Sequence, residues 1–202
     1  MLFAFLPISH PYRDDSHSSS NYKPQTTNHK HFHIAQCQLS FIFARMNILM
    51  VCLGNICRSP LAEGILQHKA WKAGLQWSVE SAGTNGYHIG EAPHRLSQKV
   101  ASLNGIDICK QRSRRFSAED FDQYDKIYAM AEDVVEDMKR IAKNRFDPKK
   151  VDLLMNELYP GENMDVPDPW YGPEAGYHDV YKMIEAACEN IVSKYANVRM
   201  SK

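Results

Sequence analysis

The sequence of 202 residues lacks any long apolar run. A helix that spans a bilayer needs about 20 consecutive apolar residues, so we expect no contact with a membrane. The short apolar start, residues 1–8, has no positively charged segment before it and no convincing small-residue cleavage site after it. These missing features argue against an export signal.

Cysteine is scarce and neither sign of charge dominates. Five cysteines without regular spacing do not form a disulfide framework, which favours a reducing, cytoplasmic location. Lys plus Arg (24) balance Asp plus Glu (24), so no basic field indicates nucleic acid as a partner. The length suits one globular domain, which we expect to be monomeric.

Residues 1–45 differ in composition from the remainder. They are rich in Ser, Asn, His and Thr and show no sustained helical or strand period, so we expect a disordered extension before a folded domain at 46–202. The extension holds the histidines His10, His17, His29, His31 and His33. They could bind a metal, but no pair has ligand spacing; we favour a flexible tail and expect neither metal nor cofactor.

From residue 46 onward, strand and helix patterns alternate. Short apolar or alternating runs predict strands at 47–52, 77–82, 126–130 and 151–155. Helices are predicted from an N-cap at Ser59, at 93–104, from Glu132, and over 180–195. This alternation predicts a three-layer α/β/α domain with a parallel sheet. Right-handed crossovers bring every strand-to-helix loop to one edge of such a sheet, where ligands bind.

The loop after the first strand has a cysteine, five residues and then an arginine. Gly54 and Asn55 permit unusual backbone angles, so the backbone N–H groups can turn inward as a nest for an anion. The following helix adds its positive N-terminal end, and the guanidinium of Arg58 suits two phosphate oxygens. The predicted phosphate-binding residues are Leu53, Gly54, Asn55, Ile56, Cys57, Arg58 and Ser59.

Cys52 stands at the floor of this predicted phosphate cradle. The positive surroundings favour its thiolate form, and a thiolate placed there is a nucleophile directed at phosphorus. We expect the hydroxyl of Ser59 to donate a hydrogen bond to the sulfur. A cysteine can also be a small buried hydrophobe, but the motif lies between a buried strand and a capped helix, the context that phosphate binding requires.

Residues 52–60, Cys-Leu-Gly-Asn-Ile-Cys-Arg-Ser-Pro, resemble the signature of the low-molecular-weight protein tyrosine phosphatases. The resemblance continues through Ala62-Glu63-Gly64, Ser81-Ala82-Gly83-Thr84, Gly105-Ile106, Asp120-Phe121-Asp122, Ala129-Met130 and Asp168-Pro169-Trp170-Tyr171-Gly172. It covers residues 46–195. It implies a four-stranded parallel sheet and metal-free hydrolysis of phosphotyrosine in proteins through a phosphocysteine intermediate.

The resemblance also implies roles for a second loop. It makes Asp168 the general acid of the first step and the base of the second. The flanking prolines would stiffen the loop that holds its carboxyl. The alternative is that Asp168 only forms an Asp-Pro turn. Trp170 and Tyr171 resemble the aromatic wall beside the acid, and Tyr87 the opposing wall, although Trp170 could be core and Tyr87 ordinary surface. His94 departs from the family pattern of acidic residues or proline.

Alternatives remain for the second thiol and for the reaction. Cys57 could form a disulfide with an oxidised Cys52 or simply pack, while we expect Cys109 and Cys188 to be structural. An arsenate reductase shares the fold and loop but needs relay cysteines. A phosphoarginine phosphatase would carry threonine at position 56. A non-catalytic phosphotyrosine-binding module would lack one of the three residues Cys52, Arg58 and Asp168.

Overall fold

The computed structural model describes residues 45–200, with side chains to Tyr195. Apart from Arg45, the predicted extension and its histidines lie outside the described residues. The strands are β1 (Met46–Cys52), β2 (Trp77–Gly83), β3 (Lys126–Ala129) and β4 (Val151–Leu153). The helices are α1 (Arg58–Lys72), α2 (Arg95–Leu103), α3 (Asp120–Gln123), α4 (Glu132–Ala142) and α5 (Glu174–Met200), with 3₁₀ turns η1 (Lys143–Arg145) and η2 (Leu154–Glu157).

The four strands form one parallel sheet in the order β2-β1-β3-β4. The chain passes from β1 to β2 on one side and then returns to β3 on the other side of β1. This reversal makes the carboxyl end of β1 the topological switch point, where ligands of open α/β sheets bind. The fold therefore places the loop after Cys52 at the position expected for a ligand site.

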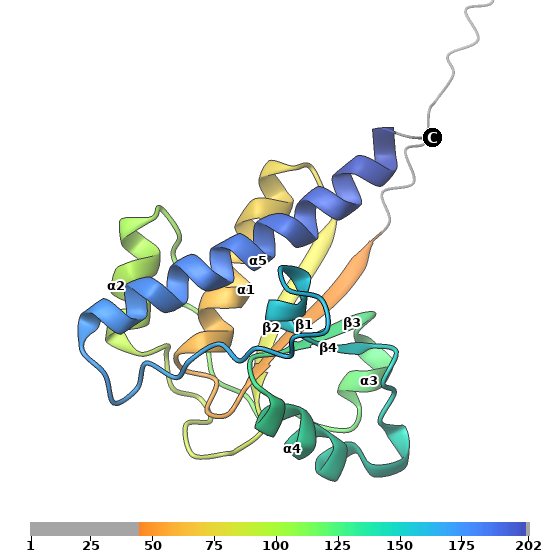
Figure 1. Cartoon of the computed structure of the whole chain (residues 1–202). Helices are drawn as coiled ribbons and strands as arrows, with labels where there is room; N and C mark the ends of the chain where they lie inside the picture. Colours follow the sequence, from red (N-terminus) through yellow and green to blue (C-terminus); the bar gives the residue numbers. More distant parts are fainter. Residues whose placement is uncertain (1–44, 201–202) are drawn as a thin grey trace, which may run out of the picture. The chain divides into compact units, whose positions relative to one another are not determined.

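The sheet separates two apolar cores, as the three-layer prediction required (Figure 1). Successive side chains of a strand point to opposite faces. Ile48 and Met50 of β1 accordingly pack into the core beneath α1 and α5, and Leu49 and Val51 into the core beneath α4. Because β1 is buried on both faces, its sequence is a continuous apolar run rather than an alternating one.

Helix and strand boundaries differ from the sequence prediction at several points. Helix α1 begins at Arg58 with Cys57 at its N-cap position, so the prediction of Ser59 as the cap was wrong; the Ser59 hydroxyl contacts Cys52 instead. Strand β4 ends at Leu153, where the chain turns into η2. Helix α5 begins at Glu174, six residues before the apolar pattern at 180–195 that predicted it. Helix α3 was not predicted, because it is too short to show a helical period.

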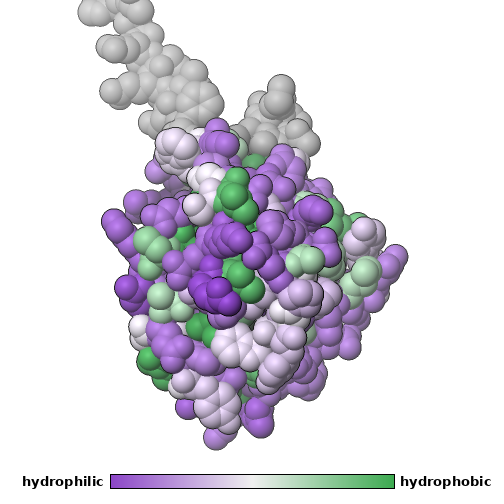
Figure 2. Space-filling model, turned by 90° about the vertical axis from the view of Figure 1, so that its left-hand side faces the viewer, coloured by the Kyte–Doolittle hydropathy of each residue, from purple (hydrophilic) through white to green (hydrophobic). Residues whose placement is uncertain are grey.

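The surface is mixed in polarity on the side that Figure 2 shows. Hydrophilic residues cover most of this face, and the hydrophobic ones form small separate spots. Among the described residues, no helix is long and apolar enough to cross a membrane.

Candidate active site

The loop between β1 and α1 depends on two residues with special backbone requirements. Asn55 adopts a left-handed conformation with φ of 54°, which asparagine tolerates better than most residues. Gly83, at the end of β2, lies directly against the loop: a Cβ there would stand 2.9 Å from the Leu53 carbonyl oxygen and 3.0 Å from the Asn55 nitrogen. Any side chain at position 83 would therefore displace the loop.

Cys52 lies at the base of this loop, with only 3% of its surface exposed. Its Sγ is 3.0 Å from the Ser59 Oγ and accepts a hydrogen bond from the Asn55 backbone N–H at 3.2 Å. The Asn55 Nδ2 donates to the same Ser59 oxygen at 2.9 Å. Because the Ser59 oxygen accepts there, its own proton can be donated either to the sulfur at 3.0 Å or to the Ala82 carbonyl oxygen at 3.4 Å. A thiolate can only accept, so the shorter contact suits that form of Cys52.

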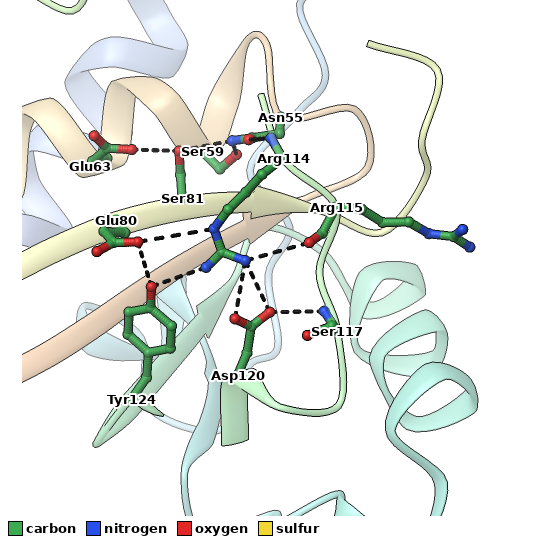
Figure 3. A network of polar contacts seen from close by, with 10 residues as sticks. All are labelled: Asn55, Ser59, Glu63, Glu80, Ser81, Arg114, Arg115, Ser117, Asp120 and Tyr124. Carbon is green, nitrogen blue, oxygen red and sulfur yellow. Dashed lines mark hydrogen bonds and ion pairs between the residues drawn. The ribbon is translucent and has the colours of Figure 1, made fainter. Parts of the chain in front are cut away.

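A network of polar contacts fixes Asn55 from behind (Figure 3). The Asn55 Oδ1 accepts from the Arg114 backbone N–H at 3.0 Å, so the amide must present its Nδ2 to the two serines. The Arg114 guanidinium is in turn held by both carboxylate oxygens of Asp120, at 3.0 and 3.2 Å. The sequence gives no sign of this role for Arg114, because residues 55 and 114 belong to separate loops.

The other arm of the network ends on a carboxyl group in α1. The Asn55 Nδ2 donates to the Ser81 Oγ at 2.8 Å, and Ser81 donates to the Glu63 Oε2 at 2.6 Å. The pKa of Glu63 is raised to about 7, chiefly by burial and also by the nearby Glu80, while the hydrogen bond from Ser81 opposes the shift. A group that titrates near neutral pH is thus connected to the nucleophile loop through Ser81 and Asn55.

Arg58 and Asp168 meet although they come from opposite ends of the domain. The Arg58 Nη2 donates to the Asp168 Oδ2 at 2.6 Å, and its Nη1 donates to the Val166 carbonyl at 3.1 Å. The Arg58 Nε is buried and has no hydrogen-bond partner among the described residues. A buried unpaired donor is costly, and an oxyanion in the adjoining pocket is a suitable acceptor for it.

A pocket of about 250 Å³ opens above Cys52. Its walls include the three aromatic residues expected from the sequence, Tyr87, Trp170 and Tyr171, together with Arg58 and Asp168. Tyr87 and Tyr171 are 85% and 97% exposed, whereas Trp170 is 39% exposed, so the first two form a rim and Trp170 a wall. Of the predicted phosphate-binding residues, all line the pocket except Asn55 and Ser59.

Comparisons with known proteins agree with this geometry. The family model described as low molecular weight phosphotyrosine protein phosphatase matches residues 47–201. This chain belongs to that family. It is 35% identical over 152 residues to the low molecular weight protein-tyrosine-phosphatase YfkJ of Bacillus subtilis, covering 73% of this chain and 94% of the relative.

Two solved structures show the same phosphatase fold. The crystal structure of Bacillus subtilis YfkJ matches with a TM-score of 0.69 and 32% identity over 75% of this chain and 94% of that one. Vibrio vulnificus Wzb in complex with benzylphosphonate matches with a TM-score of 0.66 and 29% identity over 74% of this chain and 98% of that one. The likeness therefore covers almost the whole of each relative.

The second thiol of this family member lies in the pocket wall. Cys57 is buried, and its Sγ is 3.7 Å from the hydroxyl of Tyr177. Burial raises the pKa of the Cys57 thiol to about 12, so Cys57 is not a competing nucleophile. Neither Cys109, which is exposed, nor Cys188, which lies on the buried side of α5, lines the pocket.

Two pocket residues had no assigned role in the sequence prediction. Asn85 and His88 both line the cavity; they follow β2 in the loop that carries Tyr87. The His88 Nδ1 is 2.9 Å from the Glu91 Oε2. Among residues 45–200, no group of three or more His, Cys, Asp or Glu side chains is arranged to hold a metal ion.

Proposed function

We propose that the protein is a protein tyrosine phosphatase that hydrolyses phosphotyrosine through a phosphocysteine intermediate. The observation that supports this most strongly is the meeting of the Cys52 sulfur, the Arg58 guanidinium and the Asp168 carboxyl in one pocket with aromatic walls. In this proposal Cys52 is the nucleophile, Arg58 binds the phosphate, and Asp168 is the general acid and base. Residues 53–59 form the phosphate cradle.

In the first step the Cys52 thiolate attacks phosphorus while the bond from phosphorus to the tyrosine oxygen breaks. The leaving oxygen takes a proton from Asp168, a contribution of about 10²–10⁴ in rate for such acids. The hydrogen bonds from Ser59 and from the Asn55 N–H stabilise the thiolate beforehand. Phosphate oxygens that enter the cradle compete with Asp168 for the Arg58 Nη2, which frees the carboxyl to face the leaving group.

In the second step Asp168, now a carboxylate, removes a proton from water. The water oxygen attacks phosphorus, the sulfur–phosphorus bond breaks, and inorganic phosphate leaves with the Cys52 thiolate restored. The Ser59 hydroxyl assists here as well, because a sulfur that carries a hydrogen bond leaves more readily. The cycle balances when Asp168 enters it protonated, because the proton that it gives to the leaving oxygen in the first step returns to it from water in the second.

The walls of the pocket favour an aromatic leaving group. Ile56 lines the cavity and is 6% exposed, so it is part of the pocket wall. Its hydrocarbon surface suits a phenyl ring but leaves the N–H groups of a phosphoarginine guanidinium without partners. Wzb binds benzylphosphonate, a phosphonate attached to an aromatic group, which supports the same preference here.

Two other reactions have less support from the pocket. An arsenate reductase passes a disulfide between several thiols, but among the described cysteines only Cys57 accompanies Cys52 in the cavity, so no third thiol is placed to receive the disulfide. A non-catalytic binding module would not need an acid, whereas the Asp168 carboxyl stands within hydrogen-bond distance of Arg58.

The test is an assay of the purified full-length chain with matched phosphotyrosine, phosphoserine and phosphoarginine peptides, followed by acid quenching with ³²P-labelled substrate. We expect preferential phosphotyrosine turnover and a transient acid-stable label on the protein. Cys52→Ser should abolish both, and Cys109→Ser, which changes an exposed thiol outside the pocket, should change neither. Comparable turnover by Cys52→Ser would contradict the proposal.

A further inference from the structure

His94 joins the nucleophile loop to helix α2. Its backbone N–H donates to the Ile56 carbonyl at 2.7 Å, and its side-chain Nδ1 accepts a hydrogen bond from the Leu96 N–H at 3.4 Å, which caps α2. A cap of this kind satisfies one of the unpaired donors at a helix N-terminus. The backbone and one ring nitrogen of His94 are therefore occupied by local structure, which holds the ring in one place.

The faces and edge of the same ring contact two aromatic side chains. The His94 ring is stacked on Tyr177 of α5, with centroids 5.3 Å apart and planes inclined by 20°. It also meets the Trp170 ring at 5.2 Å and 61°. Tyr177 is fully buried, so it forms a firm support behind His94. Trp170 stands in front, in the wall of the pocket.

Trp170 has few other restraints. Its backbone N–H donates to the Asp168 Oδ1 at 3.1 Å, and the ring of His88 lies 5.6 Å from its own. His88 belongs to an exposed loop and is paired with Glu91. Of the two ring contacts that Trp170 makes among the described residues, the one with His94, backed by Tyr177, links it to the buried part of the domain.

We propose that His94 is a positioning residue that holds the Trp170 ring in place as the wall for the aromatic ring of the substrate. The inference rests on the proposed function, because in it His94 contributes to the tighter binding of aryl phosphates relative to inorganic phosphate. Aromatic contacts of this type change an equilibrium about 2- to 10-fold. The ring of His94 should therefore change the affinity for ligands that reach Trp170, and it should leave unchanged the affinity for ligands that occupy only the cradle.

The neutral form of His94 is the one that this role requires. Burial lowers the pKa of His94, and the neighbouring positive charge of Arg95 lowers it further. The other titratable side chains around the ring are Tyr177 on α5 and, beyond Trp170, the His88–Glu91 pair. An uncharged imidazole keeps Nδ1 available as the acceptor for the Leu96 N–H.

Two substitutions separate the ring from the cap. Asparagine is a good N-cap but has no ring, so His94→Asn should retain the cap of α2 and lose the support of Trp170. Phenylalanine keeps a ring but has no acceptor, so His94→Phe should lower the melting temperature and retain that support. The probes are benzylphosphonate, which has an aromatic ring, and inorganic phosphate, which has none. Both are measured by calorimetric titration of the full-length chain.

We expect His94→Asn to weaken benzylphosphonate binding about 3- to 10-fold and to change phosphate binding less than about twofold. His94→Phe should bind both ligands nearly as the parent does. Equal weakening of both ligands in the Asn variant, or no weakening of benzylphosphonate, would overturn the proposal. Phosphotyrosine turnover by the parent is measured separately, so failure of the proposed enzymatic function is distinguished from failure of the role of His94.

Discussion

The Arg58 guanidinium and the Asp168 carboxylate form an ion pair with 2.6 Å between Nη2 and Oδ2, although 110 positions separate them in the sequence. The Arg58 side chain is almost buried, whereas the Asp168 side chain is partly exposed. The pair joins the nucleophile loop to the loop that precedes α5. In the proposed mechanism a phosphate ester and Asp168 would therefore share one donor, which would link substrate binding to release of the acid.

Asp168→Ala should lower kcat about 10²- to 10⁴-fold on phosphotyrosine peptides. The loss should be smaller on aryl phosphates whose leaving group needs little protonation. Affinity for inorganic phosphate should not fall, because the Arg58 Nη2 loses a competing acceptor. Steady-state kinetics with both substrate types and phosphate inhibition constants provide the check. Equal kcat losses on both substrate types would indicate a purely structural Asp168.

Ile56→Thr should reduce the preference for phosphotyrosine. A hydroxyl in the pocket wall can accept a hydrogen bond from a guanidinium, and an unpaired buried donor costs about 1–3 kcal/mol, which corresponds to roughly ten- to a hundredfold discrimination. The measurement is kcat/KM on matched phosphotyrosine and phosphoarginine peptides. Ile56→Val is the control, because it changes volume without adding a hydroxyl. The prediction fails if the parent already prefers phosphoarginine.

Peroxide should inactivate the enzyme at Cys52, and dithiothreitol should restore activity if Cys57 captures the sulfenic acid as a disulfide. With its pKa near 12, Cys57 is not itself the site of initial oxidation. Cys57→Ser should therefore lose activity at the parent's rate but recover less completely. Recovery is measured after a fixed exposure to peroxide. Full recovery of the variant would show that Cys57 has no protective role.

Glu63→Gln should change how stability depends on pH. The pKa of Glu63 is raised in the folded chain from 4.5 to about 7, so the folded state favours the protonated form. Its contribution to stability is present below pH 4.5 and is lost as pH rises through about 7. Glutamine can still accept from Ser81 and has no such dependence.

The variant's free energy of unfolding relative to the parent should therefore rise between pH 5 and pH 8, by about 2 kcal/mol. Urea unfolding at several pH values measures this difference. Glu80→Gln is a useful comparison, because Glu80 is also bonded within the network, through Tyr124, and has a more exposed side chain. Parallel pH profiles for the parent and Glu63→Gln would refute the assignment of this titration to Glu63.

The local sequence was sufficient for the features that depend on neighbouring residues. The apolar run at 47–52 predicted a strand buried on both faces, and alternation of strands and helices predicted the parallel sheet and the edge that holds the pocket. The spacing of Cys52 and Arg58 around Gly54 and Asn55 predicted the loop that lines the pocket, and anion binding by that loop stays a prediction. Each of these predictions follows from the backbone preferences or the periodicity of a few neighbouring residues, and both can be read from the local sequence.

The tertiary structure decided the contacts between segments that are distant in the chain. Ser59 appeared to be a helix cap but serves the Cys52 sulfur, because α1 begins one residue earlier than position 59 and turns the hydroxyl toward β1. No periodic pattern in the sequence predicted the roles of three other residues, Gly83, Arg114 and His94. Each of them acts through one close contact with the loop after β1. Such approaches depend on how the sheet and helices pack, and residue spacing alone does not encode them.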